Sequence, residues 1–310
     1  MRRAVAATLF EIARSDPRLV LMTADLGFMV WEEFADAYPS RFINVGVAEA
    51  NMIGLATGLA SCGYIPFVYS IATFASMRGY EQVRNGPILH NLPVRILGIG
   101  GGFEYGHGGF THHALEDLGI TRLQPGLTVI APADHVQASA AVRSTYDLPG
   151  PIYYRMGKND NFVLPGLEGR FRLEHLETIR QGSDILILTL GSISEESLKA
   201  AEKLTNKAIS VHVSVVSTLR PAPREDLLDL LGRFPVAITV EEHYIDGGLG
   251  TLVSEVTAEN GLGCRIIRCG VKNLPSLSGG ETFLRRAEGL DSEGIVRTAL
   301  VALAGRNNEQ

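Results

Sequence analysis

Residues 42–59 read FINVGVAEANMIGLATGL, and the rest of the chain is best interpreted from this segment. Its first residues are largely apolar and predict a short β-strand, which ends in a turn at Gly46. Apolar residues then recur at roughly helical spacing from Met52 to Leu59, which predicts an amphipathic helix. A strand, a turn and a helix in this order are typical of a parallel α/β sheet.

Glu49 lies in the first turn of this predicted helix, among apolar and small neighbours. A carboxylate at that position can simply be a charge that the helix dipole stabilises. The alternative is a functional carboxylate. The pattern of this stretch alone does not decide between the two, so the rest of the chain must.

Length and composition bound the class of protein. The chain has 310 residues, of which 45% are hydrophobic and 20% charged, and it contains 34 glycines. At the usual ~100–200 residues per domain, this predicts two α/β domains with a buried core in each. A net charge of −6 argues against a surface for nucleic acid or anionic membranes. The three cysteines form no CxxC pair and no apolar run is long enough to span a membrane, so we expect a cytoplasmic protein.

Strand and helix patterns alternate along most of the chain. This alternation predicts mostly parallel sheets that are covered by helices on both faces. Residues 156–182 are polar, contain Pro165 and several glycines, and break the alternation. We therefore predict a first domain over 1–158, a linker with a hairpin over 159–181, and a second domain over 182–310.

A glycine-rich loop is the most distinctive feature of the first domain. It follows a long helix predicted over 74–90 and a strand predicted over 94–98. The loop, GIGGGFEYGHGGFTHH over 98–113, holds seven glycines and three histidines in 16 residues. Parallel sheets bind ligands at the carboxyl ends of their strands, and glycines let a backbone approach a ligand closely. Histidines add proton donors and acceptors near neutral pH, so we predict a loop that faces the substrate.

A zinc site and a plain polar loop are the alternatives for His107, His112 and His113. Their HxxxxHH spacing has no cysteine or carboxylate at ligand spacing, so we predict no metal there. The sequence also has no P-loop, GxSxG or HExxH motif, and its one approximate GxGxxG lacks the third glycine and the ribose-binding acid. The chain therefore has the pattern of an α/β enzyme without a self-contained cofactor site.

Several segments, in their order and spacing, carry a resemblance to a known family. In the first domain they are ADL (24–26), RFINVGVAEANMIG (41–54), TFASMRGYEQVRN (73–85), GGFTHHALEDL (108–118), VIAPAD (129–134) and GPIYYRMGK (150–158). In the second domain they are GSDILILTLGS (182–192) and ITVEEHYIDGGLG (238–250). With these segments the chain resembles the carboxyl-terminal half of transketolase, as found in organisms that make this enzyme from two polypeptides.

The resemblance implies a thiamine-pyrimidine-binding domain followed by a transketolase carboxyl-terminal domain. It implies transfer of a two-carbon ketol unit from a ketose or its phosphate to an aldehyde, with thiamine diphosphate as the cofactor. In such enzymes the diphosphate and Mg²⁺ are held by a GDG…N motif, which this sequence lacks. The partner would then be an amino-terminal transketolase subunit that carries this motif, in an α2β2 heterotetramer that is active only when complete.

Two other functions remain as alternatives. One is the β subunit of a 2-oxo acid dehydrogenase or a related acyl-transferring enzyme, although TFASMRGYEQ and THHALEDL favour transketolase. The other is a regulatory or assembly subunit without catalytic function. Glu49, retained within its motif, argues against that second alternative.

The resemblance also implies roles for residues that contact the cofactor. Glu49 matches the glutamate that hydrogen-bonds N1′ of the aminopyrimidine and so favours the 4′-imino tautomer, whose nitrogen removes the thiazolium C2 proton. Its apolar neighbourhood is expected to raise its pKa. Phe74 matches the aromatic residue that stacks on the pyrimidine, with Tyr69 as a competitor and a core phenylalanine as the alternative. Asp25 matches an aspartate near the cofactor, or is a turn-forming residue.

Substrate contacts are implied for three further positions. His112 matches the histidine that faces the substrate hydroxyls and the reacting carbon. Arg155 matches an arginine that binds the sugar phosphate, with a surface ion pair as the alternative. His107 and His113, which are additions to the family pattern, are predicted to bind the substrate.

Two glycines depart from the family pattern. Gly108 stands where an acid is expected, and Gly100 stands where a histidine is expected. Those two side chains normally contact the sugar and its phosphate. We therefore predict that the cofactor chemistry is kept and that the donor or the acceptor differs from the standard pentose phosphates.

Overall fold

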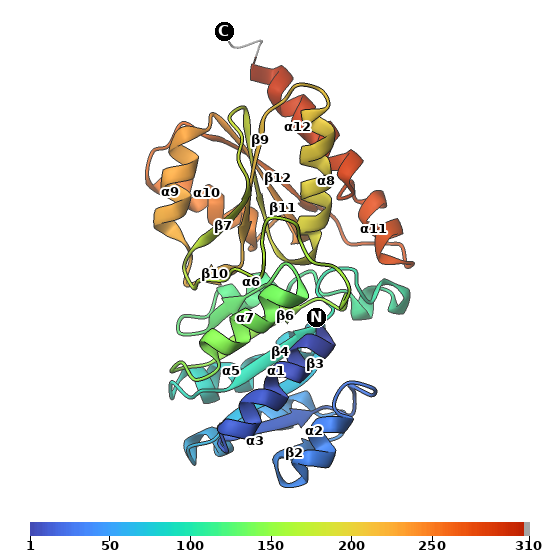
Figure 1. Cartoon of the computed structure of the whole chain (residues 1–310), viewed down its shortest axis with the longest axis vertical. Coiled ribbons are helices and arrows are strands. Elements are labelled where there is room, and N and C mark those ends of the chain that lie inside the picture. Colours follow the sequence, from blue (N-terminus) through green and yellow to red (C-terminus); the bar gives the residue numbers. More distant parts are fainter. Residues whose placement is uncertain (307–310) are drawn as a thin grey trace.

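A seven-stranded sheet forms the first of two α/β domains in the computed structural model, which describes residues 1–306 (Figure 1). Its strand order is β10-β5-β6-β4-β3-β1-β2, and all pairings are parallel except that of β10 with β5. The strands are β1 (Leu19–Thr23), β2 (Phe42–Asn44), β3 (Ile65–Ile71), β4 (Arg95–Ile99), β5 (Thr128–Ile130), β6 (Ile152–Met156) and β10 (Thr218–Arg220). The helices are α1 (Arg2–Ser15), α2 (Glu32–Ala37), α3 (Glu49–Ser61), α4 (Ala72–Met77), α5 (Tyr80–Val83), α6 (Asp117–Arg122) and α7 (His135–Thr145).

Alternation along the strands separates two hydrophobic layers. Side chains of α1 and α7 pack with Leu21 and Phe67 on one face of the sheet. Side chains of α3 pack with Met22 and Val68 on the other face. Neighbouring residues of a strand point to opposite faces of the sheet. When both faces of a mostly parallel sheet are buried, as here, the sequences of its strands are largely continuous runs of apolar residues. The predicted architecture is confirmed.

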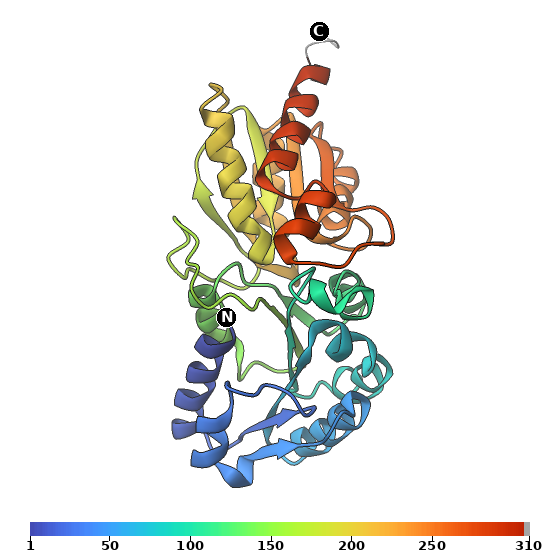
Figure 2. The ribbon, with the colours of Figure 1, turned by 90° about the vertical axis from the view of Figure 1, so that its right-hand side faces the viewer.

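The second domain is a five-stranded sheet in the order β12-β11-β8-β9-β7, parallel except for β7. Its strands are β7 (Leu176–Arg180), β8 (Ile185–Thr189), β9 (Val211–Val216), β11 (Val236–Tyr244) and β12 (Arg265–Val271). Its helices are α8 (Ser194–Thr205), α9 (Arg224–Arg233), α10 (Leu249–Glu259), α11 (Glu281–Ala287) and α12 (Ser292–Arg306). Figure 2 shows the two sheets stacked along the long axis of the molecule, with α8 and α12 on one side of the second sheet.

The domains share strands and core, which the predicted linker did not anticipate. The predicted linker over 159–181 ends in β7, a strand of the second sheet that pairs with β9 and forms no hairpin. The short strand β10, which follows β9, crosses back and extends the first sheet. One hydrophobic cluster accordingly runs from Met52 through Leu219 to Val253.

The prediction of one long helix over 74–90 is wrong. The helix α4 ends at Met77, α5 is a single turn, and residues 84–88 form a π-helical turn that contains Pro87. A Cβ on Gly79 would lie 2.9 Å from Cγ1 of Ile53 in α3, so the chain breaks where it passes close to that helix. Proline lacks an N–H and disrupts the next turn.

No helix within residues 1–306 is both long and apolar enough to cross a membrane.

Candidate active site

The carboxyl ends of β2, β3 and β4 bring three segments of the first domain to one edge of the sheet. The helix α3 begins shortly after β2, α4 follows β3 directly, and the glycine-rich loop follows β4. These strands lie in the order β4-β3-β1-β2. Parallel α/β sheets place their ligand sites at this edge, because the loops of neighbouring strands converge there.

Glu49 is the centre of the site. Its carboxylate is buried, with a side-chain exposure of 2%. Ser70 on β3 donates a hydrogen bond from Oγ to Oε1 at 2.8 Å, and Arg78 donates from Nη1 to Oε2 at 2.9 Å. A buried carboxylate with a hydrogen bond to each oxygen is fully partnered, which offsets the cost of removing it from water.

The prediction that the pKa of Glu49 is raised is wrong for this arrangement. Burial alone raises the pKa of Glu49, as we predicted. Hydrogen bonds from Arg78, from the helix backbone and from Ser70, with the charge of Arg78, outweigh burial and lower the pKa below its ordinary value. The charge that turns the pKa shift of Glu49 downward belongs to Arg78, which lies 29 positions further along the chain.

An aromatic and a histidine complete the cluster. The guanidinium carbon of Arg78 lies 3.8 Å from the centroid of the Phe74 ring, a cation–π contact. The ring of His112 meets Phe74 edge to face, with centroids 5.3 Å apart. Oγ1 of Thr111 lies 3.0 Å from Nδ1 of His112 and orients the imidazole. The structure therefore brings three of the predicted site residues, Glu49, Phe74 and His112, into one chain of contacts through Arg78.

The two unexpected glycines make room for aromatic side chains of the same loop. A Cβ on Gly108 would lie 2.7 Å from Cγ of His112, so the imidazole occupies the space of a side chain at 108. A Cβ on Gly100 would collide with the ring of Tyr105, and the backbone φ of +78° at Gly100 also favours glycine. Both departures are therefore consequences of how this loop packs.

The other two predicted cofactor contacts, Tyr69 and Asp25, have partners outside this cluster. Tyr69 is buried on the opposite face of the sheet, where its ring packs against Trp31 at a centroid distance of 5.0 Å. Asp25 is exposed and has a φ of +55°, and Oδ1 of Asp25 accepts a hydrogen bond from Nδ2 of Asn44 at 2.9 Å. This geometry fits the turn-forming alternative for Asp25 and ties β1 to the strand that leads into α3.

Three of the predicted substrate contacts are also placed elsewhere. Arg155 is only 6% exposed, and its guanidinium forms an ion pair with the buried carboxylate of Asp117 at 3.0 Å inside the protein. His113 is buried against Phe103, and burial lowers its pKa. His107 is exposed in the loop, beside Gly280 of the second domain.

The end of β11 holds the glycine-rich loop in place. Oε1 of Glu242 accepts a hydrogen bond from the backbone N–H of Phe103, and both oxygens of Glu242 accept bonds from Arg285. Nη2 of Arg155 donates to the carbonyls of Ala114 and Glu242, both at 2.8 Å. Gly102 and Ala114 exchange two backbone hydrogen bonds of 2.9 Å, which close the loop at its base. The second domain thus fixes the loop that carries His112.

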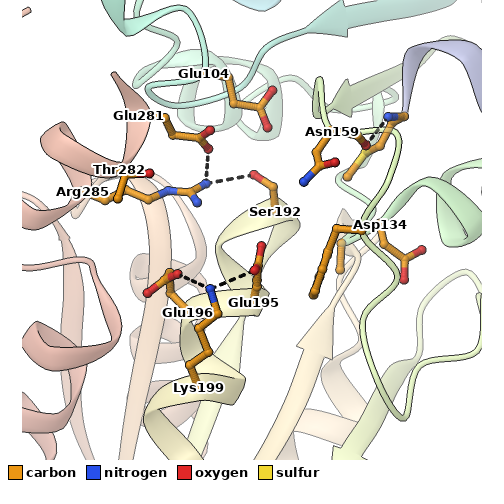
Figure 3. Close-up of a pocket in the computed structure, with 13 residues that line it drawn as sticks. Glu104, Asp134, Asn159, Ser192, Glu195, Glu196, Lys199, Glu281, Thr282 and Arg285 are labelled. Carbon is orange, nitrogen blue, oxygen red and sulfur yellow. Dashed lines mark hydrogen bonds and ion pairs between the residues drawn. The ribbon is translucent and has the colours of Figure 1, made fainter. Parts of the chain in front are cut away.

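A cavity of about 260 Å³ lies beside this junction, between the two domains (Figure 3). Glu104 of the loop and Glu281 of α11 line it, and Nη2 of Arg285 reaches Oγ of Ser192 at 3.3 Å. Burial and the negative charge of Glu242 raise the pKa of Glu281 to about 8.

Sequence reasoning missed two residues of the site, Ser70 and Arg78. Arg78 lies four residues after Phe74, so helical spacing could have placed the two side chains together. Ser70 and Val68 alternate with Tyr69 along β3, so strand parity could have placed Ser70 on the side of α3.

The side chains of this cluster fit the aminopyrimidine part of thiamine diphosphate. A buried carboxylate beside a half-exposed aromatic face suits a flat ring with a basic nitrogen. Within residues 1–306, no group of three or more histidines, cysteines or acids could hold a metal ion. The cluster therefore fits the aminopyrimidine.

This fold and site define a two-domain α/β chain with a buried carboxylate and an aromatic ring at the carboxyl edge of its first sheet. Residues 1–161 match the model of the transketolase pyrimidine-binding domain, and residues 174–295 match that of the transketolase C-terminal domain. The chain belongs to the transketolase family.

Relatives and a solved structure agree with this assignment. The chain is 34% identical to one subunit of the apulose-4-phosphate transketolase of Phocaeicola vulgatus, over 96% of each chain. It is 35% identical to the 6-deoxy-6-sulfo-D-fructose transketolase subunit SqwH of Clostridium sp., over 94% of this chain and 90% of the relative. A split-gene transketolase, solved as an inactive β4 tetramer, superposes with a TM-score of 0.89 and 32% identity over 98% of each chain.

Replacing Arg155 by methionine should destabilise the chain by about 3–5 kcal/mol, because it leaves the buried Asp117 carboxylate without its cation. Urea unfolding of the chain measures this free energy. The control Arg233→Met removes an exposed pair with Asp229 and should cost less than about 1 kcal/mol. A loss no larger than the control, together with a raised KM for the sugar, would instead support the predicted phosphate-binding role.

Replacing Glu281 by glutamine should flatten the pH dependence of stability. The folded-state pKa of about 8 lies above the ordinary value of 4.5, so the folded chain binds the extra proton and loses stability as the pH rises from 4.5 to 8. The melting temperature of Glu281→Gln should therefore fall less between pH 5 and pH 8.5 than that of the wild type. The exposed Glu259→Gln is the control, and equal slopes for the wild type and Glu281→Gln would contradict a protonated Glu281.

Proposed function

We propose that this chain is the small subunit of a two-polypeptide, transketolase-like enzyme that transfers a two-carbon ketol unit from a ketose to an aldehyde. The observation that carries the proposal is the contact chain of Glu49, Phe74 and His112 at the carboxyl edge of the first sheet. Its place in a pyrimidine-binding domain of the transketolase family, and relatives named as transketolase subunits, support it.

Thiamine diphosphate is the proposed cofactor, in line with the family. When bound, it supplies an electron sink that lets a carbon–carbon bond beside a carbonyl break and form again. Glu49 would hold a proton at N1′ of its pyrimidine, and Phe74 would support the ring. His112 would face the substrate and exchange a proton with its hydroxyl or carbonyl oxygen.

A partner subunit is proposed to hold the diphosphate and Mg²⁺. The fit of the Glu49 cluster to the pyrimidine and the lack of a GDG…N motif in the sequence support that division, as does the inactivity of the β4 tetramer of the related split-gene enzyme. We propose an α2β2 heterotetramer, located in the cytoplasm, in which each cofactor lies between the two kinds of chain.

The proposed substrate is a modified sugar rather than a standard pentose phosphate. The imidazole of His112 and the ring of Tyr105 fill the space of the two side chains that the family pattern places at 108 and 100. Because those side chains normally contact the sugar and its phosphate, the pocket presents different groups to the substrate. Relatives named for apulose-4-phosphate and for a sulfonated fructose support a divergent substrate.

Replacing Glu49 by glutamine should lower ketol transfer by the reconstituted enzyme at least about 100-fold, because an amide cannot share a proton with N1′. Steady-state turnover of the complex with its partner, assayed with a ketose donor and an aldehyde acceptor, measures the effect. Glu259→Gln, a substitution of the same kind in the second domain, should leave turnover unchanged. Undiminished turnover in Glu49→Gln would remove this mechanism and favour a subunit without catalytic function.

A further inference from the structure

Arg78 makes both of the contacts that the proposed function assigns to the cofactor. Its Nη1 donates to Oε2 of Glu49 at 2.9 Å, where N1′ of the pyrimidine would bind. Its guanidinium carbon lies 3.8 Å from the centroid of the Phe74 ring, where the pyrimidine would stack. The side chain is 45% exposed, so it can leave this position toward solvent.

A guanidinium and an aminopyrimidine have matching features. Both are flat, both stack on an aromatic face, and both present N–H donors to a carboxylate. Two flat groups cannot occupy one face of Phe74 and one oxygen of Glu49 at the same time.

From this geometry we propose that Arg78 is an internal competitor for the aminopyrimidine, which thiamine diphosphate must displace in order to bind. The inference rests on the proposed function, because it takes Glu49 and Phe74 as cofactor contacts. It adds a residue that sets the affinity for the cofactor and is itself displaced when the cofactor binds.

The competition follows from the burial of Glu49. A buried carboxylate without a cation is costly, so the free subunit keeps Arg78 against it. Once Arg78 leaves, Ser70 and the helix backbone remain as donors, and burial then acts on Glu49 without the opposing charge. Displacement of Arg78 therefore moves Glu49 toward the protonated form that the pyrimidine nitrogen requires.

The affinity of the reconstituted complex for thiamine diphosphate tests the proposal, by calorimetry with Mg²⁺ present. Arg78→Met should tighten binding roughly three- to tenfold, because the competing ion pair and cation–π contact are lost. Arg78→Lys keeps the charge without the flat stacking group and should fall between Arg78→Met and the wild type. The control Arg84→Met removes an exposed arginine six residues further along the chain and should leave the dissociation constant unchanged.

Weaker or unchanged binding in Arg78→Met would overturn the competition and leave the proposed function intact. A wild-type complex that binds no thiamine diphosphate would overturn the proposed function and this inference with it. The two failures are therefore distinct.

A second measurement on the free chain needs no cofactor. Arg78→Met should lower the urea midpoint of unfolding, because Glu49 loses its cation, and adding Glu49→Gln should restore most of that loss. Losses that simply add in the double variant would show that the two side chains are not coupled, which would overturn the contact on which the proposal stands.

Discussion

The buried carboxylate of Glu242 is the constraint on which the candidate site depends. It accepts hydrogen bonds from the backbone N–H of Phe103 and from the guanidinium of Arg285. The backbone carbonyl of Glu242 accepts a hydrogen bond from Arg155. The second domain therefore holds the glycine-rich loop at two points. Glu242 binds the loop directly at Phe103, and Arg155 links Glu242 to Ala114 at the other end of the loop. A loop so rich in glycine would otherwise have many conformations to lose on folding. Fixing its base restricts where the segment between, and with it the imidazole of His112, can lie, so the second domain positions the site although it contributes none of the three central residues.

The pKa values of two buried glutamates, Glu49 and Glu281, are shifted in opposite directions. At Glu49, a cation and two kinds of hydrogen-bond donor overcome burial, and the carboxylate stays ionised. At Glu281, burial and the like charge of Glu242 outweigh the nearby cation of Arg285, and the carboxylic acid keeps its proton near neutral pH. The same residue type thus takes opposite protonation states within one chain because the neighbouring charges differ. The decisive difference is that Glu49 has an arginine largely to itself, whereas Glu281 shares one with a second acid.

The parts of this structure that depend on local pattern could be predicted from the sequence, and those that depend on distant contacts could not. Strand and helix alternation predicted both sheets, and the family motifs singled out Glu49, Phe74 and His112, which the structure places in one chain of contacts. The burial of Arg155 could not be predicted, because its partner Asp117 lies on a different element and neither sequence segment signals the pairing. The charge that reverses the pKa shift of Glu49 likewise comes from a distant position, Arg78, directly after the end of α4. Strand β10 joins the first sheet from within the second domain, which local periodicity cannot show.

Gly100 and Gly108 differ from the family pattern, and the physical reason for this difference is visible only in the folded loop. Read along the chain, each is a lost polar side chain. In the structure, each is the space that a ring from the same loop fills, so neither position could regain a side chain without moving Tyr105 or His112. The rings of Tyr105 and His112 are therefore coupled through packing to the two glycines beside them. The backbone of the glycine-rich loop thus determines where both rings can lie as much as the side chains themselves do.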